Sequence, residues 1–107
     1  METTIRVDHA VTTLVNVFTV EPDNQPEAFA LLKESIETLF SKMPGWISSN
    51  VLKGKDGRQV VVYSQWRDDK YIDAFRGDPR MKPYLQRFGA LAKHESFICD
   101  VSYCRHA

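Results

Sequence analysis

The sequence predicts a single α+β domain whose elements follow the order β-α-β-β-α-β, on the basis of three observations. The chain has 107 residues, which is an ordinary length for one domain. Hydrophobic residues make up 43% of the chain and aromatic residues 11%, enough to form a buried core. Segments rich in β-branched residues alternate with segments whose apolar residues recur at helical spacing. This order of elements is the ferredoxin-like arrangement, built on an antiparallel sheet.

Residues 1–10 are expected to form a flexible N-terminal arm, because they mix charged and small residues without a hydrophobic period. Residues 11–107 are expected to form the single domain. Its first strand is predicted over residues 12–20, which are rich in β-branched and aromatic side chains. Both faces of this segment are apolar, so we expect a central strand that is covered on two sides.

A long amphipathic helix is predicted after Asn24, because Asn24 and Glu27 have the spacing of a capping box. Its apolar residues recur every three or four positions, namely Phe29, Leu32, Ile36, Leu39, Phe40 and Met43. The helix is expected to stop at Pro44-Gly45, because proline and glycine both disfavour its continuation.

A β-hairpin is predicted after this helix. Its arms extend over residues 46–52 and 59–66, which have extended character. The segment Lys55-Asp56-Gly57-Arg58 forms the turn between them, and Gly57 supplies a positive φ.

The second helical region is predicted in two pieces. The first carries apolar residues at helix-compatible spacing before Gly77, namely Tyr71, Ile72 and Phe75. The second begins at Asp78-Pro79, and we expect Gly89 to end it. Its apolar residues are Met81, Tyr84, Leu85 and Phe88.

The last strand is predicted over residues 97–104, where apolar and polar residues alternate. Cys99 and Cys104 are an odd number of positions apart, so we expect them on opposite faces of this strand as free thiols. Free thiols fit a reducing compartment, and residues 1–8 contain no apolar signal segment. A cytoplasmic location is therefore expected.

In the ferredoxin-like arrangement the helices cover one face of the sheet and leave the other face bare. The first and third strands lie side by side at the centre, where we expect a parallel pair. The face toward the helices is expected to carry Leu14, Asn16, Phe18, Val60, Val62, Ser64 and Trp66. The bare face is expected to carry Val15, Val17, Val61 and Tyr63. Because this face is too apolar to leave in water, we expect a homodimer, a dimeric α+β barrel.

The charge pattern argues against two classes of partner. The 14 basic and 14 acidic residues give a formal net charge of zero, so no long-range field attracts nucleic acid. The apolar stretch without charged residues, residues 10–20, is shorter than the roughly 20 residues that span a bilayer. We therefore expect neither nucleic acid nor a membrane as partner.

No residues have the spacing of a metal site, a phosphate-binding loop or a nucleophile elbow. Asn16 and Trp66 remain as candidates for chemistry, because the Asn16 carboxamide points into an apolar layer where it needs a partner. Chemistry alone favours a structural role for both residues. Trp46 is interpreted as a packing residue and His94 as a partly exposed residue before the last strand.

A family resemblance shifts this balance toward function. The segments Thr13 to Val20 (TLVNVFTV), Met43 to Trp46 (MPGW) and Val62 to Trp66 (VYSQW) occur in this order and at these separations. Together they resemble the antibiotic biosynthesis monooxygenase family over residues 11–104. Members of this family are ferredoxin-like homodimers with a pocket between sheet and helices, and the resemblance implies the same here.

Within the family, the chain is most similar to the cofactor-independent polyketide anthrone monooxygenases. Nogalamycin-type enzymes use an Asn in the first strand and a Trp that closes the third, and Asn16 and Trp66 stand in these positions. Actinorhodin-type enzymes share the Gln-Trp and Asp-Pro-Arg segments. They rely, however, on an Asn and a Tyr where this chain has Val62 and Ile72, with Tyr71 one place early.

Haem-degrading members need a Trp and an axial His where this chain has Phe75 and Leu85. The resemblance therefore implies oxidation without a metal or other cofactor, in which O₂ converts an aromatic polyketide anthrone or related phenol to a quinone. Two alternatives stay open. One is a quinol monooxygenase of general metabolism, and the other is a non-catalytic dimeric protein that binds an aromatic ligand.

The resemblance also implies roles for individual residues. Asn16 would donate its amide hydrogens to the developing oxyanion, and Trp66 would offer its indole N–H while forming a wall of the pocket. The side chains expected to line a flat apolar site are Phe18, Val62, Tyr71, Phe75 and Tyr84.

Overall fold

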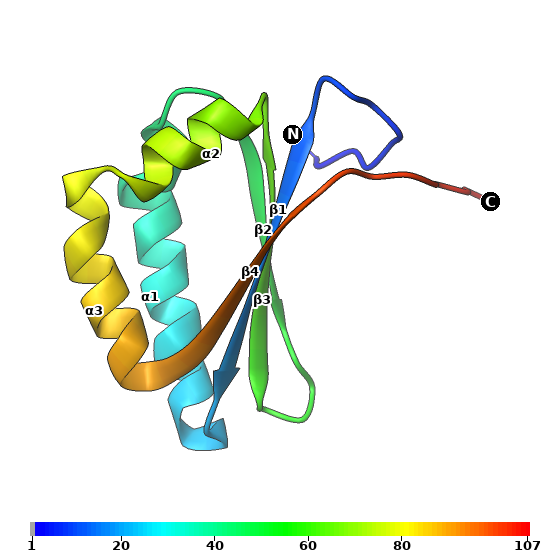
Figure 1. Ribbon diagram of the computed structural model, residues 1–107. Coiled ribbons are helices and arrows are strands. Elements are labelled where there is room, and N and C mark those ends of the chain that lie inside the picture. The colour runs from blue at the N-terminus through cyan, green and yellow to red at the C-terminus, as the bar shows by residue number, and fades with distance from the viewer. Residues whose placement is uncertain (1) are drawn as a thin grey trace.

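The computed structural model describes residues 2–107 as one four-stranded sheet with helices on one face (Figure 1). The strands are β1 (Thr12–Val20), β2 (Trp46–Lys53), β3 (Gln59–Trp66) and β4 (Ala92–Cys99). Their order across the sheet is β2-β3-β1-β4. The predicted α+β ferredoxin-like arrangement is confirmed, and β1 lies at the centre as its two apolar faces indicated.

β1 pairs antiparallel with both of its neighbours, so the expectation of a parallel central pair is wrong. The hairpin reverses the chain between β2 and β3. The connection through helix α1 (Gln25–Thr38) crosses over, so that β2 runs in the same direction as β1. β3 therefore runs opposite to β1, and every pair of neighbouring strands in the described sheet is antiparallel.

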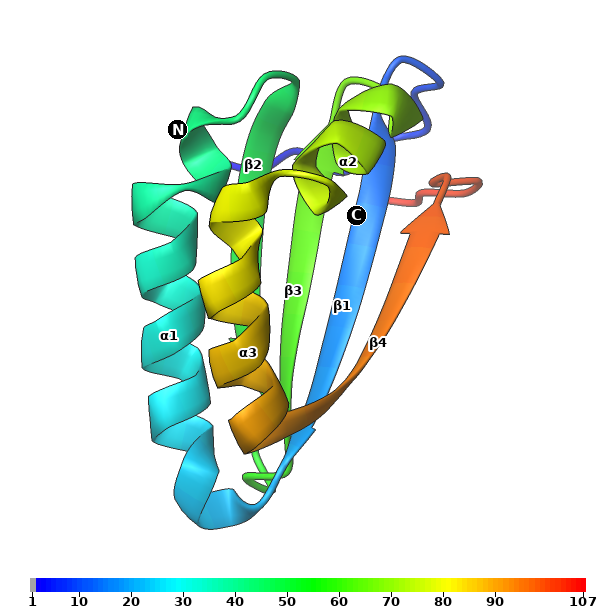
Figure 2. The same ribbon diagram turned by 60° about the vertical axis from the view of Figure 1, so that its left-hand side comes forward.

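Helices α1, α2 (Asp69–Arg76) and α3 (Lys82–Leu91) form the layer on one face of the sheet (Figure 2). Two predicted boundaries are wrong. α3 continues through Gly89, because a glycine costs a helix only about 1 kcal/mol relative to alanine. β4 begins at Ala92, earlier than predicted, and ends at Cys99, so Cys104 lies beyond the strand. Both cysteines are free, as expected.

Both ends of α1 also differ from the predicted helix. The Asn24 side chain makes no capping hydrogen bond, because Asn24 itself belongs to a short 3-10 turn, Pro22–Asn24. The last turn of the predicted helix is a separate 3-10 turn, Phe40–Lys42. Among the described residues, no helix combines the length and apolar character needed to cross a membrane.

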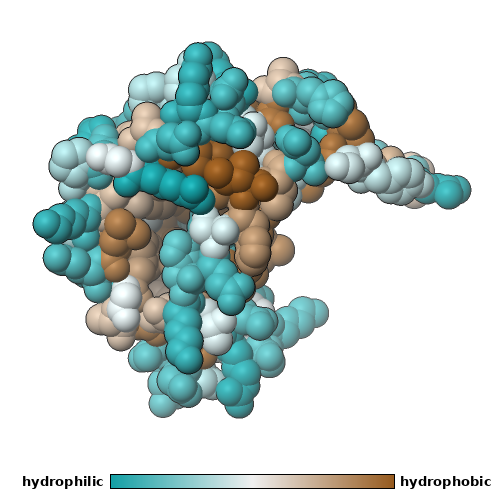
Figure 3. Space-filling model, in the orientation of Figure 1, coloured by the Kyte–Doolittle hydropathy of each residue, from teal (hydrophilic) through white to brown (hydrophobic). Residues whose placement is uncertain are grey.

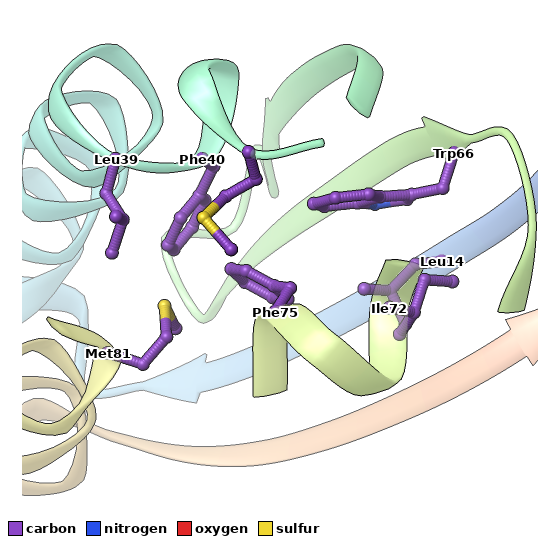
Figure 4. Packing of buried hydrophobic residues seen from close by; sticks show 8 residues of the cluster. Leu14, Leu39, Phe40, Trp66, Ile72, Phe75 and Met81 are labelled. Carbon is purple, nitrogen blue, oxygen red and sulfur yellow. The ribbon is translucent and has the colours of Figure 1, made fainter. Parts of the chain in front are cut away.

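The core lies between the sheet and the helix layer, in two clusters of buried side chains. Figure 4 shows the cluster at the end of β3, which includes Leu14, Leu39, Phe40, Trp66, Ile72, Phe75 and Met81. The second cluster includes Phe18, Leu32, Val60, Val62 and Phe88. Alternate positions of β1 and β3 contribute to both clusters. The prediction of which face of the sheet meets the helices is therefore confirmed.

The opposite face of the sheet carries the half-buried side chains Val15, Val17, Val61 and Tyr63. Part of the N-terminal segment lies against this face. Thr3 Oγ1 donates a hydrogen bond of 2.7 Å to Asn50 Oδ1, and Gln65 Nε2 donates one of 2.8 Å to the Thr4 carbonyl. No helix covers this face in Figure 1, where the helix layer lies entirely on the other side.

Candidate functional site

A cavity of about 200 Å³ lies between the sheet and the helices. In the space-filling view, apolar residues gather around the hollow between the helix layer and the sheet (Figure 3). Its apolar lining comprises Leu14, Phe18, Leu32, Phe40, Val62, Trp66, Phe75, Met81, Leu85 and Phe88. Its polar lining comprises Asn16, Ser49, Ser64, Arg76, His94 and Ser96. The cavity is therefore an apolar site with a few polar groups, which is the usual composition of a pocket for a small aromatic ligand.

Strand register brings Asn16 and His94 together on the cavity wall. Asn16 is paired with Ser96 across β1 and β4, and Phe18 is paired with His94. Residues two apart on a strand share a face, so both side chains point toward the helices. His94 Nε2 lies 2.8 Å from Asn16 Oδ1. In this orientation the carboxamide oxygen can only accept, so the contact is a hydrogen bond for an imidazole that carries a hydrogen on Nε2.

The imidazole of His94 stacks on Phe18, with ring centroids 4.6 Å apart and planes 7° from parallel. His94 remains exposed as a residue, but its partial desolvation lowers its pKa below the usual value, and the positive charge of Arg76 lowers this pKa further. Arg76 is held nearby by a hydrogen bond of 2.8 Å from its Nη2 to Ser96 Oγ. The neutral imidazole is therefore the main form of His94 at pH 7.

Replacing Arg76 with Gln is expected to raise the pKa of His94 toward the ordinary value of 6.5, because the nearby positive charge is removed. The NMR titration midpoint of His94 measures this change. Arg87→Gln is the matched control, because Arg87 pairs with Glu34 on α1. An unchanged titration midpoint in Arg76→Gln would show that the charge of Arg76 does not lower the pKa of His94.

The lowered pKa of His94 makes the stability of the fold depend on pH. The folded protein holds the pKa of His94 below its value in the unfolded chain, so the unfolded chain binds more protons as the pH falls below 6.5. This group therefore stabilises the fold at neutral pH, and its contribution is lost as the pH decreases.

Trp66 closes β3 as predicted, and only 1% of its surface is exposed. Its indole N–H donates a hydrogen bond of 3.2 Å to Ser64 Oγ, which in turn donates one of 3.1 Å to the Leu14 carbonyl. The ring lies 5.1 Å from that of Phe75 (Figure 4). The resemblance implies that the Trp66 indole N–H is offered to the substrate. In this structure the N–H instead donates to Ser64 within the protein. The indole ring itself forms part of the cavity wall.

The other predicted lining residues divide into two groups. Phe18, Val62 and Phe75 line the cavity. Tyr71 and Tyr84 are not among the residues that line it.

The orientation of each helix explains why the tyrosines miss the cavity. α2 buries Ile72 and Phe75, so Tyr71, one position before Ile72, turns aside and packs against Gly45. A side chain on Gly45, which has φ of +81°, would overlap the Tyr71 ring. Tyr84 instead reaches α1, where its hydroxyl is 2.7 Å from Thr38 Oγ1.

Three polar residues of the cavity lining, His94, Ser96 and Arg76, are not among the candidates that the sequence indicated. The last strand was predicted to begin at residue 97, so the residues before that position had no assigned face. With the strand beginning at Ala92, alternation alone puts His94 and Ser96 on one face. Nothing in the sequence marked Arg76, because its role depends on where α2 ends relative to β4.

Within residues 2–107, no three His, Cys, Asp or Glu side chains are grouped so that they could hold a metal ion.

The chain is similar to proteins of one family. The model of the family described as antibiotic biosynthesis monooxygenase matches residues 12–87. The tetracenomycin-F1 monooxygenase of Streptomyces glaucescens is 36% identical over 91 residues, which cover 85% of this chain and 81% of that protein.

Solved structures show the same fold at lower identity. SnoaB, a cofactor-independent oxygenase from Streptomyces nogalater, has a TM-score of 0.75 at 22% identity, over 89% of this chain and 96% of that one. The monooxygenase from the gene ActVA-Orf6 of Streptomyces coelicolor, solved with the ligand nanaomycin D, has a TM-score of 0.81 at 20% identity. That match covers 92% of this chain and 93% of the other.

Proposed function

Because the chain belongs to the antibiotic biosynthesis monooxygenase family, we propose that it oxidises an aromatic polyketide anthrone or related phenol to a quinone with O₂ and without a cofactor. The similarity to the tetracenomycin-F1 monooxygenase supports an aromatic polyketide as the substrate class. The observation that carries the proposal is the cavity, whose mostly apolar and aromatic lining includes the polar side chain of Asn16.

The proposed reaction needs only the substrate and O₂. Loss of a proton from the anthrone methylene leaves a carbanion whose charge is delocalised onto the ring oxygen. This carbanion passes one electron to O₂, and the two radicals combine to form a carbon–oxygen bond. Protonation of the resulting peroxide anion balances the proton lost in the first step, and the hydroperoxide then loses water and leaves a carbonyl group. One oxygen atom of O₂ enters the quinone and the other leaves as water, so no external reductant is required.

The protein contributes by binding the substrate in an apolar site and by stabilising its deprotonated form. Asn16 Nδ2 is the donor proposed for the developing oxyanion, because Oδ1 of the same group already accepts from His94. Trp66 is proposed to act as a flat wall against which the aromatic rings pack. Exclusion of water by the apolar lining strengthens both interactions.

Oxygen uptake with an anthrone tests this function in the absence of added metal, flavin or nicotinamide. We expect uptake of one O₂ per anthrone and incorporation of one labelled atom from ¹⁸O₂ into the quinone. Binding of the product quinone without oxygen uptake would instead identify a non-catalytic binding protein. Uptake with a simple quinol and not with an anthrone would favour a quinol monooxygenase.

We also propose that two copies of the chain pair through the face of the sheet opposite the helices. In addition to Val17 and Tyr63, this face carries Phe97, which is 47% exposed, and Leu52, which is 53% exposed. Contiguous apolar surface of this kind is usual at interfaces between subunits.

Light scattering at micromolar concentration is expected to give twice the chain mass of 12.3 kDa. Phe97→Glu is expected to shift the protein toward monomer, because it places a charge in the apolar face. Glu37→Gln on α1 serves as a control outside this face. A monomeric mass for the unmodified chain would contradict the proposal.

A further inference from the structure

The orientation of the Asn16 carboxamide decides whether the cavity presents a donor or an acceptor at this position. Rotating the group by half a turn exchanges Oδ1 and Nδ2 without changing its shape. Only the Nδ2 amino group can donate a hydrogen bond to an oxyanion. A neighbouring residue must therefore select one orientation if Asn16 is to serve as a donor.

His94 is the side chain that contacts the Asn16 carboxamide, at 2.8 Å from Nε2 to Oδ1. Among the hydrogen bonds of the described residues, none uses Asn16 Nδ2, which leaves this amino group for a ligand. Both the Nε2–H tautomer and the protonated imidazolium donate from Nε2. Each of these states therefore holds Oδ1 toward His94 and Nδ2 away from it.

The imidazole is itself held in place by the sheet. His94 faces Phe18 in the register of β1 and β4, and its ring stacks on that of Phe18 at 4.6 Å. Phe18 is buried and packs against Phe88 of α3, with ring centroids 5.1 Å apart. A well-packed partner gives the imidazole a defined position, which a donor needs in order to orient a second group.

We propose that His94 is a positioning residue that holds the Asn16 carboxamide with its amino group available to the oxyanion of the substrate. This inference rests on the proposed function and adds a residue to that site. His94 acts through Asn16 and takes no proton from the substrate. The interaction it supports is strongest when the oxyanion is fully developed, so its loss affects kcat more than KM.

Two substitutions separate positioning from other roles of His94. His94→Phe keeps an aromatic ring to stack on Phe18 but removes the donor. His94→Gln places an amide N–H at about the position of Nε2 and cannot act as a base near neutral pH. We expect kcat for oxygen uptake to fall by about 10-fold or more in His94→Phe, with KM little changed, and to return to within about 3-fold in His94→Gln.

The other outcomes overturn the inference. An equal loss of kcat in both variants would make His94 a base or another ionisable participant. Unchanged kcat in both would remove it from the mechanism. Thermal unfolding curves are measured for both variants to check that each is folded under the assay conditions.

NMR of ¹⁵N-labelled protein tests the same inference without turnover. The ring nitrogens of His94 are expected to show the Nε2–H tautomer at neutral pH, and this preference should weaken in Asn16→Ala. An Nδ1–H tautomer in the unmodified protein would overturn the inference even if the protein oxidises anthrones. If the Nε2–H tautomer is observed but no oxygen is taken up, the proposed function is wrong, while the hydrogen bond from His94 to Asn16 stands.

Discussion

Replacing Asn16 with Ala is expected to lower kcat for oxygen uptake with an anthrone by about 10²-fold or more, the scale on which one oxyanion donor contributes. The amino group of Asn16 is the donor proposed for the developing negative charge. Without it, the charge would form in an apolar cavity with no carboxamide to stabilise it. The fold is expected to survive, because the substitution removes a polar group from an apolar layer.

Asn50→Ala is the matched control for this prediction. Asn50 lies on β2, donates its hydrogen bond to the Tyr63 carbonyl at 3.1 Å and is not part of the cavity lining. Its replacement is expected to leave kcat within about 3-fold of the unmodified protein, because Asn50 lies on the face of the sheet opposite the cavity. Equal rates for Asn16→Ala and the unmodified protein would contradict the proposed mechanism.

Replacing Trp66 with Ala is expected to lower the free energy of unfolding by about 3–5 kcal/mol, the usual cost of removing a large aromatic side chain from a core. Trp66 is 1% exposed and packs against Phe75. Urea denaturation measures the loss. Tyr103→Ala is the control, because Tyr103 is 75% exposed and its replacement is expected to change stability by less than about 0.5 kcal/mol.

Trp66→Phe separates the packing role of the indole from a chemical role of its N–H. The hydrogen bond from this N–H to Ser64 Oγ indicates that the group serves the core. We therefore expect a lower melting temperature in Trp66→Phe and a kcat within about 3-fold of the unmodified protein. A large fall in kcat at an unchanged melting temperature would instead assign the indole N–H to the reaction.

Sequence patterns predicted the parts of the fold that depend on residues close together in the sequence. Alternation along residues 12–20 and 59–66 indicated which side chains of β1 and β3 face the helices. The glycine at position 57 has the positive φ of +82° that the hairpin turn requires. Both signals are local, because strand alternation and turn geometry are set by a few consecutive residues.

Boundaries near the C-terminus were predicted less well. Gly89 was interpreted as the end of a helix, but α3 continues to Leu91. A glycine inside a helix is a modest cost that packing elsewhere offsets, so the residue type alone does not decide the boundary. The last strand was predicted from residue 97 but begins at Ala92, so alternation assigned no face to His94.

The sequence by itself determined that Asn16 and Trp66 lie on the helix side of a central sheet, because each follows from alternation within one strand. Tertiary structure alone decided what these two side chains contact. Asn16 meets His94, 78 positions away, through the register of β1 and β4. Trp66 directs its N–H to Ser64, and Tyr71 and Tyr84 turn away from the cavity. These contacts depend on how strands pair and how helices rotate over the sheet, and such long-range packing leaves no periodic signal in the chain.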